Sequence, residues 1–337
     1  MKVLYAIQGT GNGHLSRARD IVPILQKKKI HLDILVSGTQ ADISIPHPIK
    51  YQLSGLSFIF GKKGGVDMWR TYFRTNAARL QKEVKSIPVS DYDLIINDFE
   101  PVSAWACKLR QKPCIALSHQ AAVLSPHAPR PKKKDALGKL ILTKYAPSTK
   151  QYGFHFKAYD ENLFTPIIRQ EIRNTTRTTD KHYTVYLPSY SEEKIMGVLS
   201  NIKNTYWEVF SKHGPTKFFW KNMTIRPIDN TAFIQSMASS KGVLCGAGFE
   251  TPAEALHMQN KLLVIPMKGQ YEQQCNAAAL NEMGVPVIKS LKKKHLDKIR
   301  AWVDSDTKVD IFYPDITENI IDRLLEETLV SPTHEFL

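Results

Sequence analysis

The sequence predicts an α/β protein with two doubly wound domains, in which helices cover both faces of a mostly parallel sheet. Short apolar runs typical of strands alternate with helical patterns in both halves of the chain, and a polar segment separates the halves. A chain of 337 residues with 42% hydrophobic residues also suits two globular domains. Because ligands of such sheets bind beyond the carboxyl ends of the strands, we expect two facing sheets to enclose a cleft.

In the first half, strand-like runs are separated by segments whose apolar residues recur at three- and four-residue spacing, which indicates helices. Alternation of this kind predicts a parallel sheet buried on both faces. Pro23 lies inside the first helical pattern, where it would remove a hydrogen bond and kink the helix, so the bounds of this helix stay open. We expect strands at 2–7, 32–37, 94–97 and 114–117, and helices at 15–26, 69–84 and 102–109.

The second half repeats this pattern, with a helix expected after each strand. Residues 169–181 (RQEIRNTTRTTDK) are polar and poor in apolar side chains, which is typical of a linker. The C-terminal run 316–329 has a helical pattern and is a candidate to cross back to the first domain. We expect strands at 183–187, 207–210, 243–245 and 262–265, and four segments: a first domain at 1–168, the linker at 169–181, a second domain at 182–312 and a C-terminal segment at 313–337.

The chain is basic, with 46 Lys and Arg against 32 Asp and Glu and a net charge of +14, which suggests an anionic partner. The sequence lacks RNP-like aromatic strands, zinc-finger spacing and a basic zipper, and this disfavours nucleic acid. Residues 131–145 (PKKKDALGKLILTKY) combine lysines with apolar residues and favour contact with an anionic membrane surface. The alternative is a helix packed on its own domain with its lysines solvated.

These patterns favour a cytoplasmic protein that contacts the inner face of a membrane peripherally. Residues 1–7 run directly into a strand pattern, without the basic and long apolar regions of a secretory signal. No apolar run approaches the roughly 18 residues of a membrane span. The cysteines show no metal-ligand pairing and lie in apolar segments, which predicts buried thiols in a reducing compartment; they are Cys107, Cys114, Cys245 and Cys275.

The segment 242–280 holds the most informative binding pattern. Gly246, Ala247 and Gly248 form a small-residue turn between a buried strand and a helix expected to begin near Thr251. Unpaired backbone N–H groups and the positive helix dipole at such a turn would hold a diphosphate. Glu254, one turn into that helix, is placed to accept from ribose hydroxyls. The alternative is that Glu254 completes a capping box with Thr251.

Glu272 and Gln273 open the next helix with an acceptor and an amide, a combination that suits neighbouring sugar hydroxyls. The alternative for Glu272 is a carboxylate that the helix dipole favours near an N-terminus. Both residues follow a buried strand at 262–265, so we expect them at the same edge of the second sheet as the small-residue turn.

The N-terminal sequence GTGNGHLSRA places several glycines in front of His14. His14 stands where a dinucleotide-binding fold would carry its third glycine, and no Walker A lysine follows. An imidazole that faces the cleft would act as a general base, whereas the alternative is a helix-start histidine bonded to the backbone. Gly11, Asn12 and Gly13 form a candidate loop for the diphosphate or for an acceptor.

Asp98 ends a strand at the sheet edge where His14 is also expected. A carboxylate there would accept from one imidazole nitrogen, fix the tautomer and stabilise the charged form of the ring. The alternative is an aspartate that caps the helix following Pro101. Glu100 and His119 follow comparable strand ends and are weaker candidates.

Three motifs resemble the GT-B glycosyltransferases that use nucleotide-diphosphate sugars: GTGNGH at the start, and CGAGFETPAEAL and GQYEQQCNAAAL near the end. The motifs are similar to those of the lipid II N-acetylglucosaminyltransferase and of the plant and macrolide glucosyltransferases. The resemblance implies two Rossmann-like domains facing across a cleft, with the donor bound by the second domain and the acceptor by the first.

By this resemblance, His14 is the base of the inverting members, Asp98 is its partner, and Glu254 binds the ribose. Retaining relatives would carry a second glutamate eight positions before Glu254, where this chain has Gly246, and this difference favours inversion.

The resemblance also assigns the rest of the donor site. Glu272 and Gln273 match the pair that holds the donor sugar ahead of an Asn-Ala dipeptide, here at Asn276. Pro227 and Ile228 lie in the loop whose backbone meets the uracil.

We therefore expect an inverting glycosyltransferase that moves a hexosyl group from a UDP-sugar to an acceptor hydroxyl. The acceptor is unidentified and is a candidate for lipid linkage or membrane association. We expect no cofactor and no metal. Asp91 and Asp93 have the spacing of a metal-binding DxD motif, but they lie at the start of their strand, which is the end away from the expected cleft. The alternatives are a nucleotide-sugar epimerase of the same architecture and a noncatalytic membrane-associated module.

Overall fold

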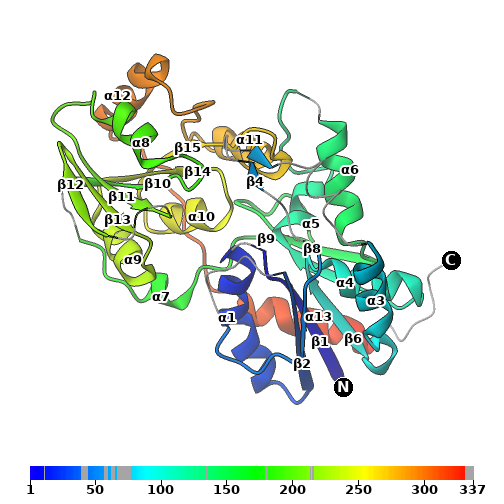
Figure 1. The fold of residues 1–337 in the computed structure, drawn as a ribbon. Helices are drawn as coiled ribbons and strands as arrows, with labels where there is room; N and C mark the ends of the chain where they lie inside the picture. Colours follow the sequence, from blue (N-terminus) through cyan, green and yellow to red (C-terminus); the bar gives the residue numbers. More distant parts are fainter. Residues whose placement is uncertain are drawn as a thin grey trace.

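The computed structural model describes residues 1–10, 12–38, 45–56, 60–61, 65–66, 77–133, 135–178, 181–212, 214 and 216–330. Two separate, mainly parallel sheets form the centres of two α/β domains, and helices pack on both faces of each sheet (Figure 1). The fold class predicted from the sequence is confirmed.

The first sheet has seven parallel strands, in the spatial order β3 (Tyr51–Leu53), β2 (His31–Ser37), β1 (Lys2–Gln8), β6 (Leu94–Asp98), β7 (Ile115–Ser118), β8 (Lys150–Phe154) and β9 (Leu163–Phe164). Its helices are α1 (Asn12–Lys27), α3 (Ala77–Ser86), α4 (Pro101–Leu109), α5 (His119–Leu124) and α6 (Ala136–Tyr145). Along β1, Tyr5 and Ile7 pack in the core that contains α1, whereas Leu4 and Ala6 pack in the core that contains α4. This alternation explains why the strand reads as a continuous apolar run.

Helix α1 runs through Pro23 to Lys27, so the proline does not end the helix expected at 15–26. Ile21, Val22 and Leu25 are fully buried on either side of Pro23. Burial of this apolar stripe against the first sheet outweighs the local cost of the proline in the helix.

The second sheet has six strands, in the spatial order β12 (Phe218–Trp220), β13 (Met223–Pro227), β11 (Tyr206–Ser211), β10 (His182–Tyr186), β14 (Gly242–Gly246) and β15 (Lys261–Ile265). Only the edge strand β12 pairs antiparallel in this sheet. The helices of this domain are α8 (Glu192–Leu199), α9 (Asn230–Ser239), α10 (Glu250–His257), α11 (Tyr271–Glu282) and α12 (Leu296–Asp304).

Five strands of the two main sheets were not predicted from the sequence: β3, β8, β9, β12 and β13. They are two to five residues long; β3, β8, β12 and β13 contain polar or exposed residues, and β9 has only two residues, so no apolar run of ordinary strand length marks them. Of the helix expected at 69–84, residues 69–76 lie outside the described residues, and the described part is α3, which spans Ala77–Ser86. Tertiary pairing decides strands of this kind, because their local propensity is weak.

Several short elements complete the chain. They are the paired strands β4 (Phe60–Gly61) and β5 (Gly65–Val66), the 3₁₀ turns η1 (Val89–Asp91) and η2 (Lys293–His295), and α7 (Gln170–Arg173), which lies within the segment expected to be a linker. Across the residues that the structure describes, no helix is long and apolar enough to cross a membrane.

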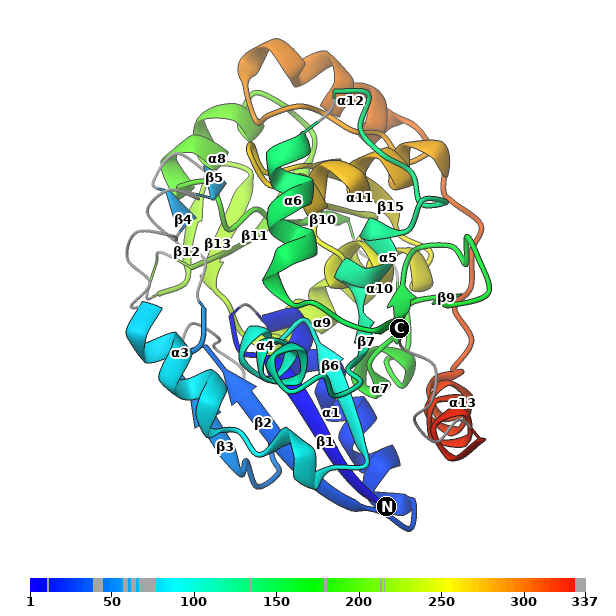
Figure 2. The ribbon, with the colours of Figure 1, turned by 90° about the vertical axis from the view of Figure 1, so that its right-hand side faces the viewer.

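The last helix, α13 (Thr317–Val330), packs against α1 of the first domain (Figures 1 and 2). Its Ile320, Ile321 and Leu324 are buried in the core that contains β1 and α1. At the surface, Lys28 Nζ lies 2.8 Å from Glu318 Oε1 and 2.7 Å from Asp322 Oδ1. The chain thus leaves the second domain and returns to brace the first.

The buried face of α13 should contribute strongly to stability. Ile321→Ala removes a fully buried side chain and should lower the free energy of unfolding by about 2–5 kcal/mol. Glu326→Ala, at an exposed position of the same helix, is the matched control and should change it by less than about 0.5 kcal/mol. Urea denaturation followed by circular dichroism measures both, and equal effects would contradict the packing role of α13.

Candidate active site

The predicted base and its partner meet at the carboxyl edge of the first sheet. β1 and β6 are neighbours, with Ile7 opposite Asp98, and α1 begins a few residues after β1 ends. His14 Nδ1 lies 2.8 Å from Asp98 Oδ1. The His14 side chain is 12% exposed, whereas Asp98 is fully buried. Among the described residues, none bonds His14 Nε2, so this nitrogen is available to a substrate.

The alternative for Asp98, a helix cap, is wrong. Glu100 is the N-cap of α4, and its side chain accepts from Val102 N at 2.7 Å and from Ser103 N at 2.6 Å. Glu100 also accepts from Ser37 Oγ at 2.5 Å. Glu100 therefore has a structural role, which leaves Asp98 free to hold the imidazole.

Arg17 joins this pair to the second domain. Its guanidinium donates to Asp98 through Nε at 3.1 Å and through Nη2 at 2.8 and 2.9 Å, while Nη1 donates to Glu250 Oε1 at 2.5 Å. Burial alone would raise the pKa of the Asp98 carboxyl, but Arg17 and His14 outweigh burial and lower it. Asp98 is therefore held as a carboxylate.

Arg17 and Glu250 were not singled out from the sequence. Arg17 follows His14 at the i+3 spacing that places two side chains on one helix face, a signal that could have found it. Glu250 comes from the other domain, and it lies so close to Gly13 that a Cβ atom there would stand 3.1 Å from Glu250 Cγ. Asn12 is the first residue of α1, and Gly11 lies outside the described residues.

The small-residue turn of the second domain lies before a helix start that lacks a side-chain cap. β14 ends at Gly246, and α10 begins at Glu250. The N-cap residue of α10 is Phe249, whose side chain cannot accept a hydrogen bond from the first turn of the helix. The capping-box alternative for Glu254 is therefore wrong. A Cβ atom at Gly248 would meet nothing within 4 Å, so the space beside this residue of the turn is open.

A hydrogen bond between Asn276 and Ala247 holds the turn at 246–248 in place. Ala247 is fully buried, and its carbonyl accepts from Asn276 Nδ2 at 3.1 Å. Asn276 Oδ1 lies 2.8 Å from His119 Nε2, and the His119 ring stacks on Phe249 with centroids 3.9 Å apart. His119 is buried at this contact between domains, and burial lowers its pKa. We assign it a packing role.

Glu254 is enclosed by an ion pair. Arg169 Nε and Nη2 donate to its two oxygens at 2.5 and 3.0 Å, and the Glu254 side chain is only 5% exposed. Arg169 begins the segment expected to be a linker, and nothing in its sequence context marked it. A ribose can reach Glu254 only if this pair opens.

The remaining donor candidates face in different directions. Glu272 Oε2 accepts from Gln120 Nε2 of the first domain at 3.0 Å, whereas Gln273 Oε1 accepts from Met267 N at 2.8 Å within its own loop. Pro227 ends β13, three strands away from β14 in the sheet, and Ile228 follows with 37% of its surface exposed. The structure brings Glu272 to the domain contact and leaves Pro227 and Ile228 at the far side of the same edge.

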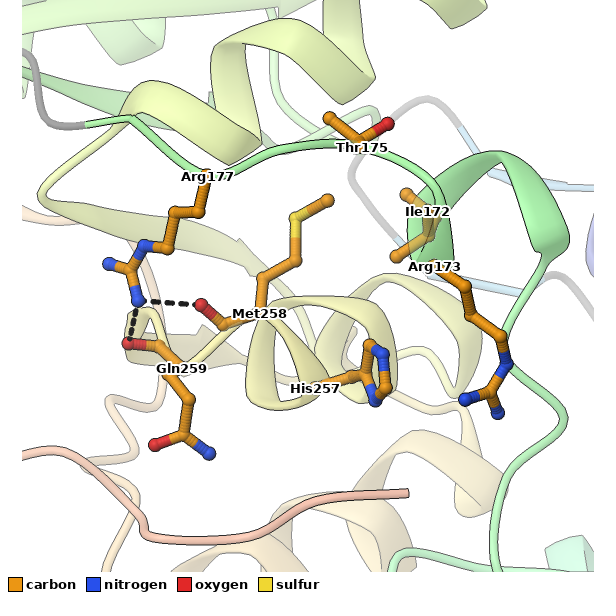
Figure 3. Close-up of a pocket in the computed structure, with 7 residues that line it drawn as sticks. All are labelled: Ile172, Arg173, Thr175, Arg177, His257, Met258 and Gln259. Carbon is orange, nitrogen blue, oxygen red and sulfur yellow. Dashed lines mark hydrogen bonds between the residues drawn. The ribbon is translucent and has the colours of Figure 1, made fainter. Parts of the chain in front are cut away.

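A surface pocket lies away from these residues, at the end of α10. It has a volume of about 260 Å³, and Arg177 there donates to the carbonyls of Met258 and Gln259 (Figure 3). No predicted site residue lines it. Within the described part of the chain, no group of three His, Cys, Asp or Glu side chains gathers as metal ligands. Asp93 accepts from Lys2 N at 2.7 Å, at the edge opposite His14.

The carboxylate of Glu250 should make stability depend on pH. Burial raises its pKa from 4.5 to about 7, against the opposing effect of Arg17. The folded protein thus keeps a proton that the unfolded chain loses, so the free energy of unfolding should fall between about pH 4.5 and 7. Glu250→Gln should flatten this decline by about 1–3 kcal/mol in urea titrations at pH 5 and pH 8. An equal decline in both proteins would contradict this assignment.

Solved structures share the whole architecture. The glycosyltransferase SnogD from Streptomyces nogalater is 12% identical, with 98% of this chain and 95% of that chain covered and a TM-score of 0.53. The S. aureus MnaA–UDP co-structure is 10% identical over 100% of both chains, with a TM-score of 0.65. MurG of Acinetobacter baumannii is 11% identical over 96% of this chain and 99% of its own, with a TM-score of 0.56. Identities this low show a common fold alone.

Curated protein sequences provide no significant match. A sequence model of one family, described as glycosyl transferase family 1, matches residues 1–304 of the 337 residues. Together with the two facing α/β domains, this match shows that the chain belongs to glycosyl transferase family 1 and is a glycosyltransferase of the GT-B fold.

Proposed function

We propose that this glycosyltransferase moves a hexosyl group from a UDP-sugar to an acceptor hydroxyl with inversion, and that His14 is the general base. The observation that carries the proposal is the 2.8 Å contact of His14 Nδ1 with the buried Asp98 carboxylate, which leaves Nε2 as the ring nitrogen that can accept a proton. A carboxylate at Nδ1 favours the tautomer with the proton on that nitrogen and the lone pair on Nε2.

The reaction is a single displacement. His14 Nε2 takes the proton of the acceptor hydroxyl while its oxygen attacks the anomeric carbon. The bond from that carbon to the diphosphate oxygen breaks, and UDP leaves with the electron pair. Asp98 stabilises the imidazolium that forms. One displacement inverts the anomeric configuration, which agrees with Gly246 standing where a retaining relative would carry a glutamate.

The donor diphosphate would lie at the turn from Gly246 to Gly248. The uncapped start of α10 and the space in front of Gly248 support this position. Oriented N–H groups would stabilise the negative charge that develops on the leaving diphosphate. The proposed mechanism therefore needs no metal ion for this role. The uracil would meet the backbone at Pro227 and Ile228, at the same edge of the second sheet.

Sugar and ribose hydroxyls would replace existing contacts. Glu272 would exchange Gln120 for a hydroxyl of the hexose, with Gln273 beside it, and Glu254 would exchange one arm of Arg169 for the ribose. Two of the similar solved structures are complexes with a nucleoside diphosphate, MnaA with UDP and the rhamnosyltransferase SpnG with thymidine diphosphate, and this supports a nucleoside diphosphate as part of the donor.

The acceptor is proposed to lie at an anionic membrane surface. On α6, Leu142 and Tyr145 are buried, whereas Leu137 and Leu140 are 56% and 54% exposed. Exposed lysines flank these leucines, at Lys132, Lys133, Lys139 and Lys144, and Lys134 lies outside the described residues. Helix α6 therefore packs on its own domain, as the alternative for residues 131–145 expected. Its opposite face is exposed and combines leucines with lysines, which suits contact with a membrane surface.

Loss of His14 should remove the proton acceptor. His14→Ala should lower kcat by about 10² to 10⁴, with little change in KM for the donor, because the ring acts on the acceptor hydroxyl. UDP release from UDP-glucose, UDP-galactose and UDP-N-acetylglucosamine, with a polar lipid extract as the acceptor source, measures this. His31→Ala, at a side chain that is 66% exposed, is the control and should keep wild-type rates.

A His14→Ala enzyme within about threefold of wild type would refute the base. NMR of the glycoside product tests inversion, since retention would refute a single displacement. Conversion of UDP-N-acetylglucosamine to an epimer without any acceptor would favour the epimerase alternative instead.

The exposed leucines of α6 should govern membrane contact. Leu137→Ala combined with Leu140→Ala should weaken binding to vesicles containing about 30% phosphatidylserine by about five- to thirtyfold in co-sedimentation, since about 1–2 kcal/mol of apolar burial is lost. Leu109→Ala, at another exposed leucine, should leave it unchanged. Equal binding of the α6 variant, or no binding of wild type, would contradict the membrane proposal.

A further inference from the structure

Arg17 has more hydrogen-bonding capacity than the His14–Asp98 pair requires. Its Nε and Nη2 hold Asp98 with three hydrogen bonds, and only Nη1 reaches across the domain contact to Glu250. The side chain is 2% exposed. Nη1 is therefore a fixed donor, pointed at the second domain by a carboxylate of the first.

Glu250 lies where the proposed donor would carry its phosphates. It is the first residue of α10, two positions after Gly248, and its side chain lies against Gly13 of the first domain. A carboxylate in this place meets a positive helix N-terminus and a guanidinium. These are the two features that also bind a phosphate group.

Glu250 is held more weakly than its neighbour on the same helix. Both oxygens of Glu254 accept from Arg169, and its side chain is 5% exposed. Glu250 is 21% exposed, and among the described residues only Arg17 donates to it, through one oxygen. A single bond would need to break for the Glu250 side chain to turn outward.

We propose that Arg17 binds the diphosphate of the donor through Nη1, and that Glu250 is a carboxylate stand-in which the diphosphate displaces. This inference rests on the proposed function, because it names a further residue of the same donor site. The displaced carboxylate turns towards solvent, and the diphosphate takes its place between the guanidinium and the start of α10. Burial, which raises the pKa of Glu250 to about 7, makes the exchange easier.

This arrangement would link the leaving group to the base. Arg17 would contact the diphosphate with Nη1 while Nε and Nη2 keep Asp98 against His14. Negative charge that grows on the leaving diphosphate would then meet a fixed positive charge. Arg17 would thus assist departure of the diphosphate and also position the His14–Asp98 pair, which activates the acceptor hydroxyl.

Calorimetric binding of UDP and of uridine to the full chain tests the proposal. Arg17→Gln should weaken UDP binding by about tenfold or more and leave uridine binding within about twofold, because only the phosphates lose a charged donor. Arg17→Lys, which keeps the charge but loses the planar fork, should give an intermediate loss. Glu250→Gln should strengthen UDP binding by about tenfold and leave uridine binding unchanged, since a competing carboxylate is removed.

Arg173→Gln is the matched control. Arg173 donates to the backbone carbonyls of Ile168, Tyr313 and Pro314, so its loss should not alter the ratio of UDP to uridine affinity.

Wild-type affinity for UDP in a folded Arg17→Gln variant would overturn the inference and leave the proposed function standing. If that variant does not fold, the Glu250→Gln result decides, and unchanged or weaker UDP binding there would overturn the inference. Wild-type protein that binds neither UDP nor another nucleoside diphosphate would refute the proposed function and this inference together.

Discussion

The site depends on one buried positive charge. Arg17 is enclosed where the two domains meet, and it bonds a carboxylate of each domain, Asp98 and Glu250. A buried cation that loses such a partner typically costs about 3–5 kcal/mol, so the packing of both domains is tied to these contacts. The geometry of His14 follows from the same constraint, because Arg17 fixes the carboxylate that orients the imidazole.

Every predicted acidic donor ligand already has a protein partner. Glu254 is paired with Arg169, and Glu272 accepts from Gln120 of the first domain. A nucleotide sugar must therefore exchange protein contacts for its own, and its apparent affinity is reduced by the free energy of breaking them. By contrast, His119 and Asn276 join the domains through neutral, buried contacts that need not open. The contact between His119 and Asn276 can therefore stay in place while the contacts of Glu254 and Glu272 are replaced by those of the nucleotide sugar.

His14 and Asp98 were predicted to share an edge although they are 84 positions apart, and the structure places them in hydrogen-bonding contact. The prediction was possible because both follow strands whose order in a parallel sheet limits where their ends lie. Arg169 and Glu250 offered no such signal. Glu250 lies 233 positions from its partner Arg17, and Arg169 lies 85 positions from its partner Glu254, so no local spacing marks either ion pair. Long-range ion pairs of this kind depend on how whole domains dock.

The sequence by itself determined the two doubly wound domains, since strand and helix periods are local properties of the chain, and it located the glycine turns from which the site is built. It did not determine the short strands such as β12 and β13, whose pairing is decided by their neighbours. Only the tertiary structure decided which cation each carboxylate meets. The physical reason is that a charge finds its partner through the packing of distant elements, whereas hydrophobic periodicity is encoded within each element.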